Sequence, residues 1–169
     1  LQRAAGAAER LVELLAETSD IPDAGTIAAA SKTSLKFESV QFAYPSRPTQ
    51  LALNDFTLDI HHGESVALVG PSGAGKSTVF ELILRFYDPT AGAIRFGSTD
   101  LRDLSLDSWR QKIALVPQQP ALFSGDIFYN IAYGAVEPSA ATVEAAAAMA
   151  HAHDFIQALP DGYQSHLGA

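Results

Sequence analysis

The chain has 169 residues and a formal net charge of −8, with 47% hydrophobic and 18% charged residues. This composition is typical of a globular domain, and the acidic balance argues against a broad surface for nucleic acid. The absence of cysteine excludes disulfides and thiolate metal sites. No run approaches the roughly 18 apolar residues that a membrane-spanning helix requires, and the charged N-terminal stretch lacks the cleavage pattern of a signal peptide.

The N-terminal segment predicts a helix followed by a linker. Its apolar residues recur at helical spacing and form one stripe, made of Ala4, Ala8, Leu11, Val12 and Leu15. We expect this helix to end near Thr18, because residues 19–34 contain Pro, Gly and Ser and have no period. The sequence therefore predicts two parts, a helix with its linker over residues 1–33 and a folded domain over residues 34–169.

From residue 35 onward, short apolar segments predict a series of β-strands. The stretch LKFESVQFAY alternates in two halves, with Leu35 and Phe37 facing inward in the first and Val40 and Phe42 in the second. The run SVALV at residues 65–69 has the continuous apolar character of a strand that is buried on both faces. Further strands are expected at residues 56–60, 93–96 and 112–118.

Four segments predict helices. The first is expected over residues 76–87, where the following DPTAG sequence stops it. The second begins in LSLDSWRQK, which carries Ser and Asp near its start, and a short third helix in DIFYNIAYG is closed by Gly134. Residues 139–159 are rich in alanine, which favours helix strongly, and they predict one long helix.

A glycine-rich motif separates the apolar run at 65–69 from the helix expected at residue 76. Its sequence GPSGAGKS fits the pattern G-x-x-x-x-G-K-[ST] of a phosphate-binding loop. The residues are Gly70, Pro71, Ser72, Gly73, Ala74, Gly75, Lys76 and Ser77. A loop that wraps a phosphate turns backbone N–H groups inward, so side chains at Gly73 and Gly75 would collide with the ligand or prevent positive φ. The helix N-terminus that follows favours an anion.

Three side chains at the end of the motif suit the chemistry of a nucleoside triphosphate. Lys76 can reach the β and γ phosphates as a point charge, and Ser77 can place its hydroxyl on Mg²⁺. Thr78 can bond the α phosphate. The alternative is a tight turn between strand and helix with a lysine on the surface. The position of the motif between an apolar run and a helix favours the phosphate loop.

Four ordered stretches resemble the nucleotide-binding domain of an ABC transporter, of the exporter type with fused membrane and ATPase domains. SVQFAYPSRP resembles the adenine-contacting loop, and LVGPSGAGKSTVFELILRFYDPTAG is similar to the phosphate loop and its helix. LVPQQPALFSGDIFYNIAYG resembles the glutamine loop and the segment after it, and AHDFIQALPDGY resembles the stretch before the signature motif. The match runs from about Leu35 to the last residue.

The resemblance implies an α/β fold, namely a truncated P-loop NTPase core of the ABC ATPase type with an early antiparallel β portion and the start of a helical subdomain. It implies ATP and Mg²⁺ as ligands, with Lys76 and Gln118 as catalytic residues and Ser77 and Gln118 at the metal ion. Tyr44 would stack on adenine, although the residues alone favour a tyrosine that covers the core at a strand end. Gln118 would touch Mg²⁺ and the attacking water, and its alternative is a polar residue at a strand end.

The resemblance also implies partners. The opening AAERLVELLAE resembles the end of the last transmembrane helix and its connection to the ATPase domain. The expected partners are the transmembrane domain of the same transporter and a second ATP-binding domain in a head-to-tail dimer. The parent protein would lie in a membrane, with this part on the cytoplasmic face, and would couple ATP hydrolysis to export.

Some features of the family are not found. The signature motif, the second nucleotide strand with its Asp-Glu pair and the switch histidine do not occur in the 169 residues. We therefore expect a piece of a cassette that is inactive as an ATPase by itself. Gly97-Ser98 and Gln119 stand where exporters usually carry Asp-Gly and an acidic residue. Two alternatives stay open, a nucleotide-binding module that does not hydrolyse ATP and a soluble ABC ATPase that acts on nucleic acid.

Overall fold

The computed structural model describes residues 12, 15–16, 21–23 and 25–167, which belong to two compact units, Leu1–Ala114 and Leu115–Ala169. Of the predicted N-terminal helix, Val12, Leu15 and Ala16 are helical. Ala4, Ala8, Leu11 and the predicted helix end at Thr18 lie outside the described residues. None of the helices in the described part of the chain has the length and hydropathy that crossing a bilayer requires.

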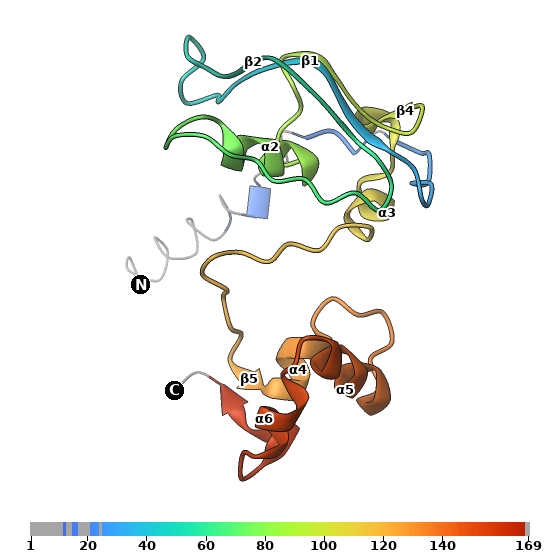
Figure 1. Ribbon diagram of the computed structural model, residues 1–169, viewed down its shortest axis with the longest axis vertical. Helices are drawn as coiled ribbons and strands as arrows, with labels where there is room; N and C mark the ends of the chain where they lie inside the picture. The colour runs from blue at the N-terminus through green and yellow to red at the C-terminus, as the bar shows by residue number, and fades with distance from the viewer. Residues whose placement is uncertain (1–11, 13–14, 17–20, 24, 168–169) are drawn as a thin grey trace. The chain divides into compact units, whose positions relative to one another are not determined.

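The first unit contains a four-stranded sheet in the order β2-β1-β3-β4 (Figure 1). All neighbouring strands are antiparallel. The strands are β1 (Leu35–Ala43), β2 (Leu51–Ile60), β3 (Ala91–Phe96) and β4 (Thr99–Asp100). The predicted strands at 35–44, 56–60 and 93–96 are therefore confirmed, and β2 begins earlier than its sequence pattern suggests.

The two halves of β1 both face the core because the strand contains a bulge. The register of β1 shifts between Phe37 and Val40 against β2, and Ser39 between them has a φ of 46°. An inserted residue changes the phase of the side chains that follow. Phe37, Val40 and Phe42 are consequently all buried, as the two-part alternation of the sequence predicts.

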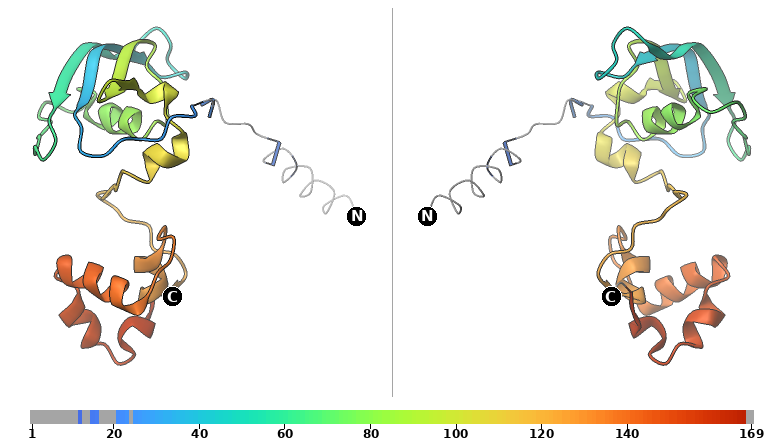
Figure 2. Two further views of the ribbon diagram at one scale, coloured as in Figure 1. Left: turned by 90° about the vertical axis from the view of Figure 1, so that its right-hand side faces the viewer. Right: turned by 90° about the vertical axis from the view of Figure 1, so that its left-hand side faces the viewer.

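Helix α2 (Lys76–Ile83) lies along one side of this sheet (Figures 1 and 2). The chain then passes through β3, β4, a 3₁₀ turn at Leu101–Asp103 and α3 (Leu106–Arg110), which Ser105 caps. Trp109 of α3 is buried and donates its indole N–H to the carbonyl of Ile83 at 2.7 Å. The resulting core consists of Phe37, Val40, Phe42, Leu53, Val79, Leu82, Ile94, Leu101, Leu104 and Trp109.

The described part of the predicted linker is bound to this core. Ile27 forms an isolated parallel bridge with Leu104, where the N–H of Ile27 donates to Asp103 at 3.2 Å and its carbonyl accepts from Ser105 at 2.9 Å. The N–H of Ala29 donates to the Ser108 hydroxyl at 3.1 Å. These bonds tie residues that are remote in sequence to the region between the 3₁₀ turn and α3.

Arg85 holds the C-terminal end of α2. Its side chain is 1% exposed, and its Nε lies 3.0 Å from Asp88 Oδ1. The same guanidinium donates to the carbonyls of Leu104 at 3.2 Å and Pro22 at 3.1 Å. A buried guanidinium requires such partners to offset its loss of hydration, and here they come from three separate segments.

Two predicted helices end earlier than expected, because non-glycine residues adopt a left-handed conformation. Helix α2 ends at Ile83 rather than at residue 87, where Arg85 has a φ of 53°. The predicted helix over 139–159 is two helices, separated by His151 with a φ of 55°. In both places the N–H of the following residue donates a hydrogen bond to the carbonyl five residues earlier, from Phe86 to Glu81 and from Ala152 to Ala147. This is the Schellman end, which usually carries glycine and which the sequence therefore does not reveal.

The predicted strands at 65–69 and 112–118 are wrong, because neither segment is a strand in the structure. Val69 is 88% exposed and Val116 is 93% exposed, and only Leu68 and Ile113 of these runs pack against the core, where they are partly buried. A strand forms only where a neighbour accepts its backbone hydrogen bonds, and no strand pairs with either run within residues 25–167. Apolar character alone therefore gave an incorrect prediction here.

The second unit is a small helical cluster. It contains α4 (Ile127–Ala132), α5 (Ala140–Met149), α6 (His153–Gln157) and a 3₁₀ turn at Gly162–Gln164. Strands β5 (Gly125–Asp126) and β6 (His166–Leu167) pair antiparallel. Ile127, Ala147 and Ile156 form its buried centre. Gly134 follows α4 with a φ of 86°, which confirms it as the residue that closes this helix.

We expect Arg85→Leu to lower the free energy of unfolding of the first unit by about 2–4 kcal/mol. The substitution removes the partner of Asp88 and leaves two carbonyls without their donor. Urea unfolding of the two proteins measures the difference. Arg47→Leu is the control, because Arg47 is exposed and should change stability by at most about 0.5 kcal/mol. Equal effects of the two substitutions would show that Arg85 does not hold these segments together.

Candidate functional site

The glycine-rich loop enters α2 through a glycine that no other residue can replace without strain. Gly75 is the N-cap of α2 with a φ of 83°, and Gly73 has a φ of 80°. A Cβ on Gly75 would lie 2.7 Å from the carbonyl oxygen of Ala52 and from a methyl group of Leu53, both on β2. Positive φ and contact with β2 therefore both require glycine at position 75.

The loop and the first turn of α2 enclose a cavity of about 320 Å³. Its lining residues belong to the predicted phosphate loop, except for Thr78 directly after it, and they are Ser72, Gly73, Gly75, Lys76, Ser77 and Thr78. No acidic residue occurs in the first turn of α2. The free N–H groups of a helix start carry partial positive charge, so this cavity favours an anion. Of the remaining predicted residues, Gly70, Pro71 and Ala74 form the loop backbone around it.

Lys76 supplies the formal charge of the cavity. Its ammonium donates to the carbonyl oxygens of Gly70 at 2.8 Å and Pro71 at 2.7 Å. Among the ion pairs of the described residues, none involves Lys76. Neutral carbonyls thus hold the ammonium at the beginning of the loop without cancelling its charge, which leaves it available to an anionic ligand.

A magnesium ion would find one protein ligand in the loop. Ser77 is exposed and lines the cavity, so its hydroxyl is accessible. No group of three His, Cys, Asp or Glu side chains that could hold a metal ion occurs in the described part of the chain. Gln118 lies at an exposed bend of the second unit, and its role at a metal ion stays a prediction.

The structure places Tyr44 next to the phosphate loop. Tyr44 follows β1, and its hydroxyl lies 2.8 Å from Thr78 Oγ1 and 2.9 Å from Glu81 Oε2, both on α2. Its half-buried ring packs against Phe42 and Tyr87, with centroid distances of 5.0 and 5.4 Å. Burial raises the pKa of the Tyr44 phenol, and the Glu81 carboxylate acts in the same direction, so the hydroxyl keeps its proton.

Glu81 is the residue that the sequence reasoning missed. It lies three residues after Thr78, so both side chains share one face of α2. The signal in the sequence is only this spacing. The spacing indicates a shared site only when the structure shows that Tyr44, 37 residues earlier, contacts the same face of α2.

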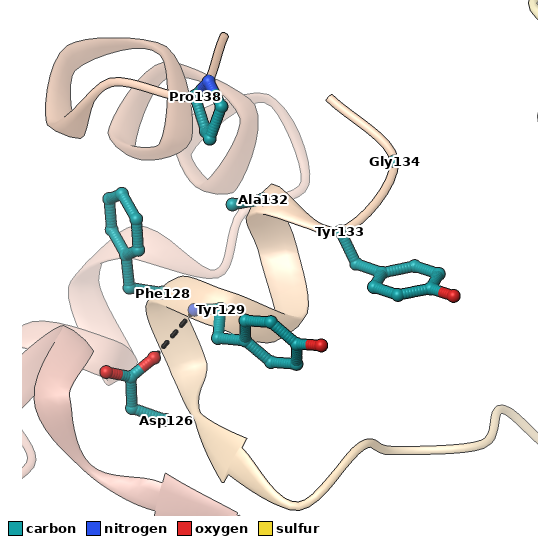
Figure 3. Close-up of a pocket in the computed structure, with 7 residues that line it drawn as sticks. All are labelled: Asp126, Phe128, Tyr129, Ala132, Tyr133, Gly134 and Pro138. Carbon is teal, nitrogen blue, oxygen red and sulfur yellow. Dashed lines mark hydrogen bonds between the residues drawn. The ribbon is translucent and has the colours of Figure 1, made fainter. Parts of the chain in front are cut away.

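A second cavity of about 460 Å³ lies on the second unit (Figure 3). Figure 3 shows Tyr129 and Tyr133 projecting in the same direction, while Asp126 bonds to the N–H of Tyr129 at 2.6 Å. The ring of Tyr133 also stacks on Phe123, with a centroid distance of 4.2 Å. The cavity is lined by Asp126, Phe128, Tyr129, Ala132, Tyr133, Gly134 and Pro138. Because its formal charge is negative, it is unsuitable for a phosphate.

Comparisons with known proteins identify the family to which the chain is similar. The family model described as "ABC transporter" matches residues 53–167. The chain is 42% identical over 158 residues to ABC transporter B family member 2 of Dictyostelium discoideum. The aligned region covers 94% of this chain and 11% of that protein. The chain is 41% identical over 170 residues to ATP-dependent permease MDL1 of Candida albicans, which covers 100% of this chain and 25% of that protein.

A solved structure is also similar. The structure of a bacterial Atm1-family ABC exporter with ATP bound aligns with a TM-score of 0.81 at 39% identity, over 99% of this chain and 29% of that chain. The chain thus spans between 11% and 29% of the length of these three proteins. The expected P-loop fold of the ABC ATPase type is confirmed, and the chain belongs to the ABC transporter family.

Proposed function

We propose that this chain is the ATP-binding part of an ABC exporter that couples ATP hydrolysis to the transport of a substrate across a membrane. The observation that carries the proposal is the phosphate loop. Two left-handed glycines precede an eight-residue helix whose first turn has no acidic residue, and Lys76, which bonds to two neutral carbonyls, lines the same cavity. These features together suit an anion such as a polyphosphate.

Lys76 would act on the phosphates directly. On binding, its ammonium exchanges the carbonyls of Gly70 and Pro71 for oxygens of the β and γ phosphates. A charged oxygen accepts a stronger hydrogen bond than a carbonyl, so this exchange is favourable. In hydrolysis the same charge stabilises the negative charge of the transferred phosphoryl group, where catalysis consists mostly of positioning and electrostatic stabilisation.

Ser77 would hold Mg²⁺ together with phosphate oxygens and water. The ion, when bound, neutralises charge that develops between the β and γ phosphates. The Ser77 hydroxyl would be a ligand of the ion, because Ser77 lines the cavity beside Lys76.

The partners follow from the kind of relatives. An ATP-dependent permease, a multidrug transporter and an ABC exporter are among the similar proteins. We infer that a transmembrane domain of the same protein and a second ATP-binding domain, arranged head to tail, complete the site. The chain would then work at the cytoplasmic face of a membrane.

Lys76→Ala in the full-length protein should reduce ATP hydrolysis about a hundredfold or more, as the loss of one electrostatic contact to a transition state typically does. Phosphate release with Mg²⁺-ATP measures it. Unfolding stability should stay within about 0.5 kcal/mol, because the bonds of the Lys76 ammonium within the described residues go to carbonyls of its own loop. Lys112→Ala, at an exposed position of the same unit, should hydrolyse ATP normally. Hydrolysis by Lys76→Ala at the rate of this control would contradict the proposal.

Tyr44→Ala should weaken the binding of ATP and ADP to a similar extent, by about tenfold each, because both carry the same base and lose one stacking contact. Calorimetry with both nucleotides measures the dissociation constants. Inorganic tripolyphosphate has no base and serves as the control ligand, with unchanged affinity expected. If ATP bound to Tyr44→Ala as tightly as to the unchanged protein, Tyr44 would serve only to cover the core.

A further inference from the structure

A short chain of hydrogen bonds connects the end of β1 to the helix of the phosphate loop. The Tyr44 hydroxyl donates to Glu81 Oε2 at 2.9 Å and lies 2.8 Å from Thr78 Oγ1. A carboxylate has no proton to donate, so the single proton of Tyr44 belongs to the bond with Glu81. The bond with Thr78 must then use the proton of Thr78. The three side chains therefore form one directed chain, from Thr78 through Tyr44 to Glu81.

This chain restricts what Thr78 can offer a nucleotide. Its side chain is buried, with 4% of the residue exposed, and its hydroxyl proton points to Tyr44. Thr78 is the third residue of α2, where the backbone N–H has no partner within the helix. A bond from Thr78 to a phosphate oxygen must accordingly come from its backbone N–H and not from its hydroxyl.

We propose that Glu81 is a positioning residue that holds Tyr44 at a set place beside the phosphate loop. Glu81 thereby favours nucleotides over polyphosphates that carry no base. The inference rests on the proposed function, in which Tyr44 stacks on adenine. Glu81 lies on the same helix whose first turn would bind the phosphates. Its bond to Tyr44 therefore fixes the position of the Tyr44 ring relative to the phosphate site. Without this acceptor, the Tyr44 hydroxyl bonds to Thr78 alone and its ring loses one of its two polar anchors on α2.

The test compares two ligands in calorimetry with the chain of residues 1–169, namely Mg²⁺-ATP and Mg²⁺-tripolyphosphate. Glu81→Leu should weaken ATP binding about five- to tenfold, as the loss of one ordinary hydrogen bond does. It should leave tripolyphosphate binding unchanged or slightly tighter, because a negative charge is removed. Glu81→Gln keeps an acceptor oxygen and should recover most of the affinity for ATP. Glu144→Leu, at an exposed helical glutamate of the second unit, should change neither affinity.

A double substitution separates positioning from general damage to the helix. Tyr44→Phe removes the hydroxyl and should weaken ATP binding as Glu81→Leu does. Because either change interrupts the same chain, the protein with both changes should bind ATP no more weakly than the weaker of the two single variants. Circular dichroism of each variant verifies that it is folded.

Several results would overturn the inference. Equal weakening of ATP and tripolyphosphate by Glu81→Leu would mean that Glu81 supports the helix as a whole. Unchanged ATP binding by Glu81→Leu, or additive losses in the double variant, would mean that Glu81 does not act through Tyr44. If the unchanged chain bound tripolyphosphate as tightly as ATP, the result would support the phosphate site. It would contradict the stacking of Tyr44 on the base and, with it, the role of Glu81. If it bound neither, the proposed function would fall as well.

Discussion

Helix α2 is held at both ends, and the geometry of the candidate site depends on this. At its N-terminal end Gly75 touches the backbone of β2, where even a methyl group would collide. At its C-terminal end the indole of Trp109 and the guanidinium of Arg85 bond to the last turn and to neighbouring segments. Between them Val79 and Leu82 are buried against the sheet. The free N–H groups of the first turn are therefore presented in a fixed direction, which is what an anion site requires.

The same helix connects the elements that would recognise the two ends of a nucleotide. Its first turn belongs to the phosphate cavity, and the following turn carries the acceptor of the Tyr44 hydroxyl. Tyr44 at the end of β1 and the glycine-rich loop are thereby related through one rigid element. This arrangement reduces the disorder that a ligand would have to remove on binding, and so favours affinity.

The segments at 65–69 and 113–116 show the opposite situation. Their apolar residues are largely exposed, and their backbones pair with no strand within residues 25–167. Apolar composition contributes to stability only when the side chains are removed from water, and a strand forms only when a neighbour takes up its hydrogen bonds. The sheet of the first unit satisfies both conditions because β1 lies between β2 and β3, which supply a partner on each side.

The sequence by itself determined the elements whose causes are local. The loop motif, the alternation of β1, the Ser near the start of α3 and the closing Gly134 are patterns of neighbouring residues, and the structure contains each of them. The tertiary structure decided what depends on residues remote in sequence. Arg85 and His151 end helices without glycine, the apolar runs remain outside the sheet, and Tyr44 meets Glu81 across 37 residues. These outcomes depend on burial and on partners that packing brings together, which a local pattern cannot contain.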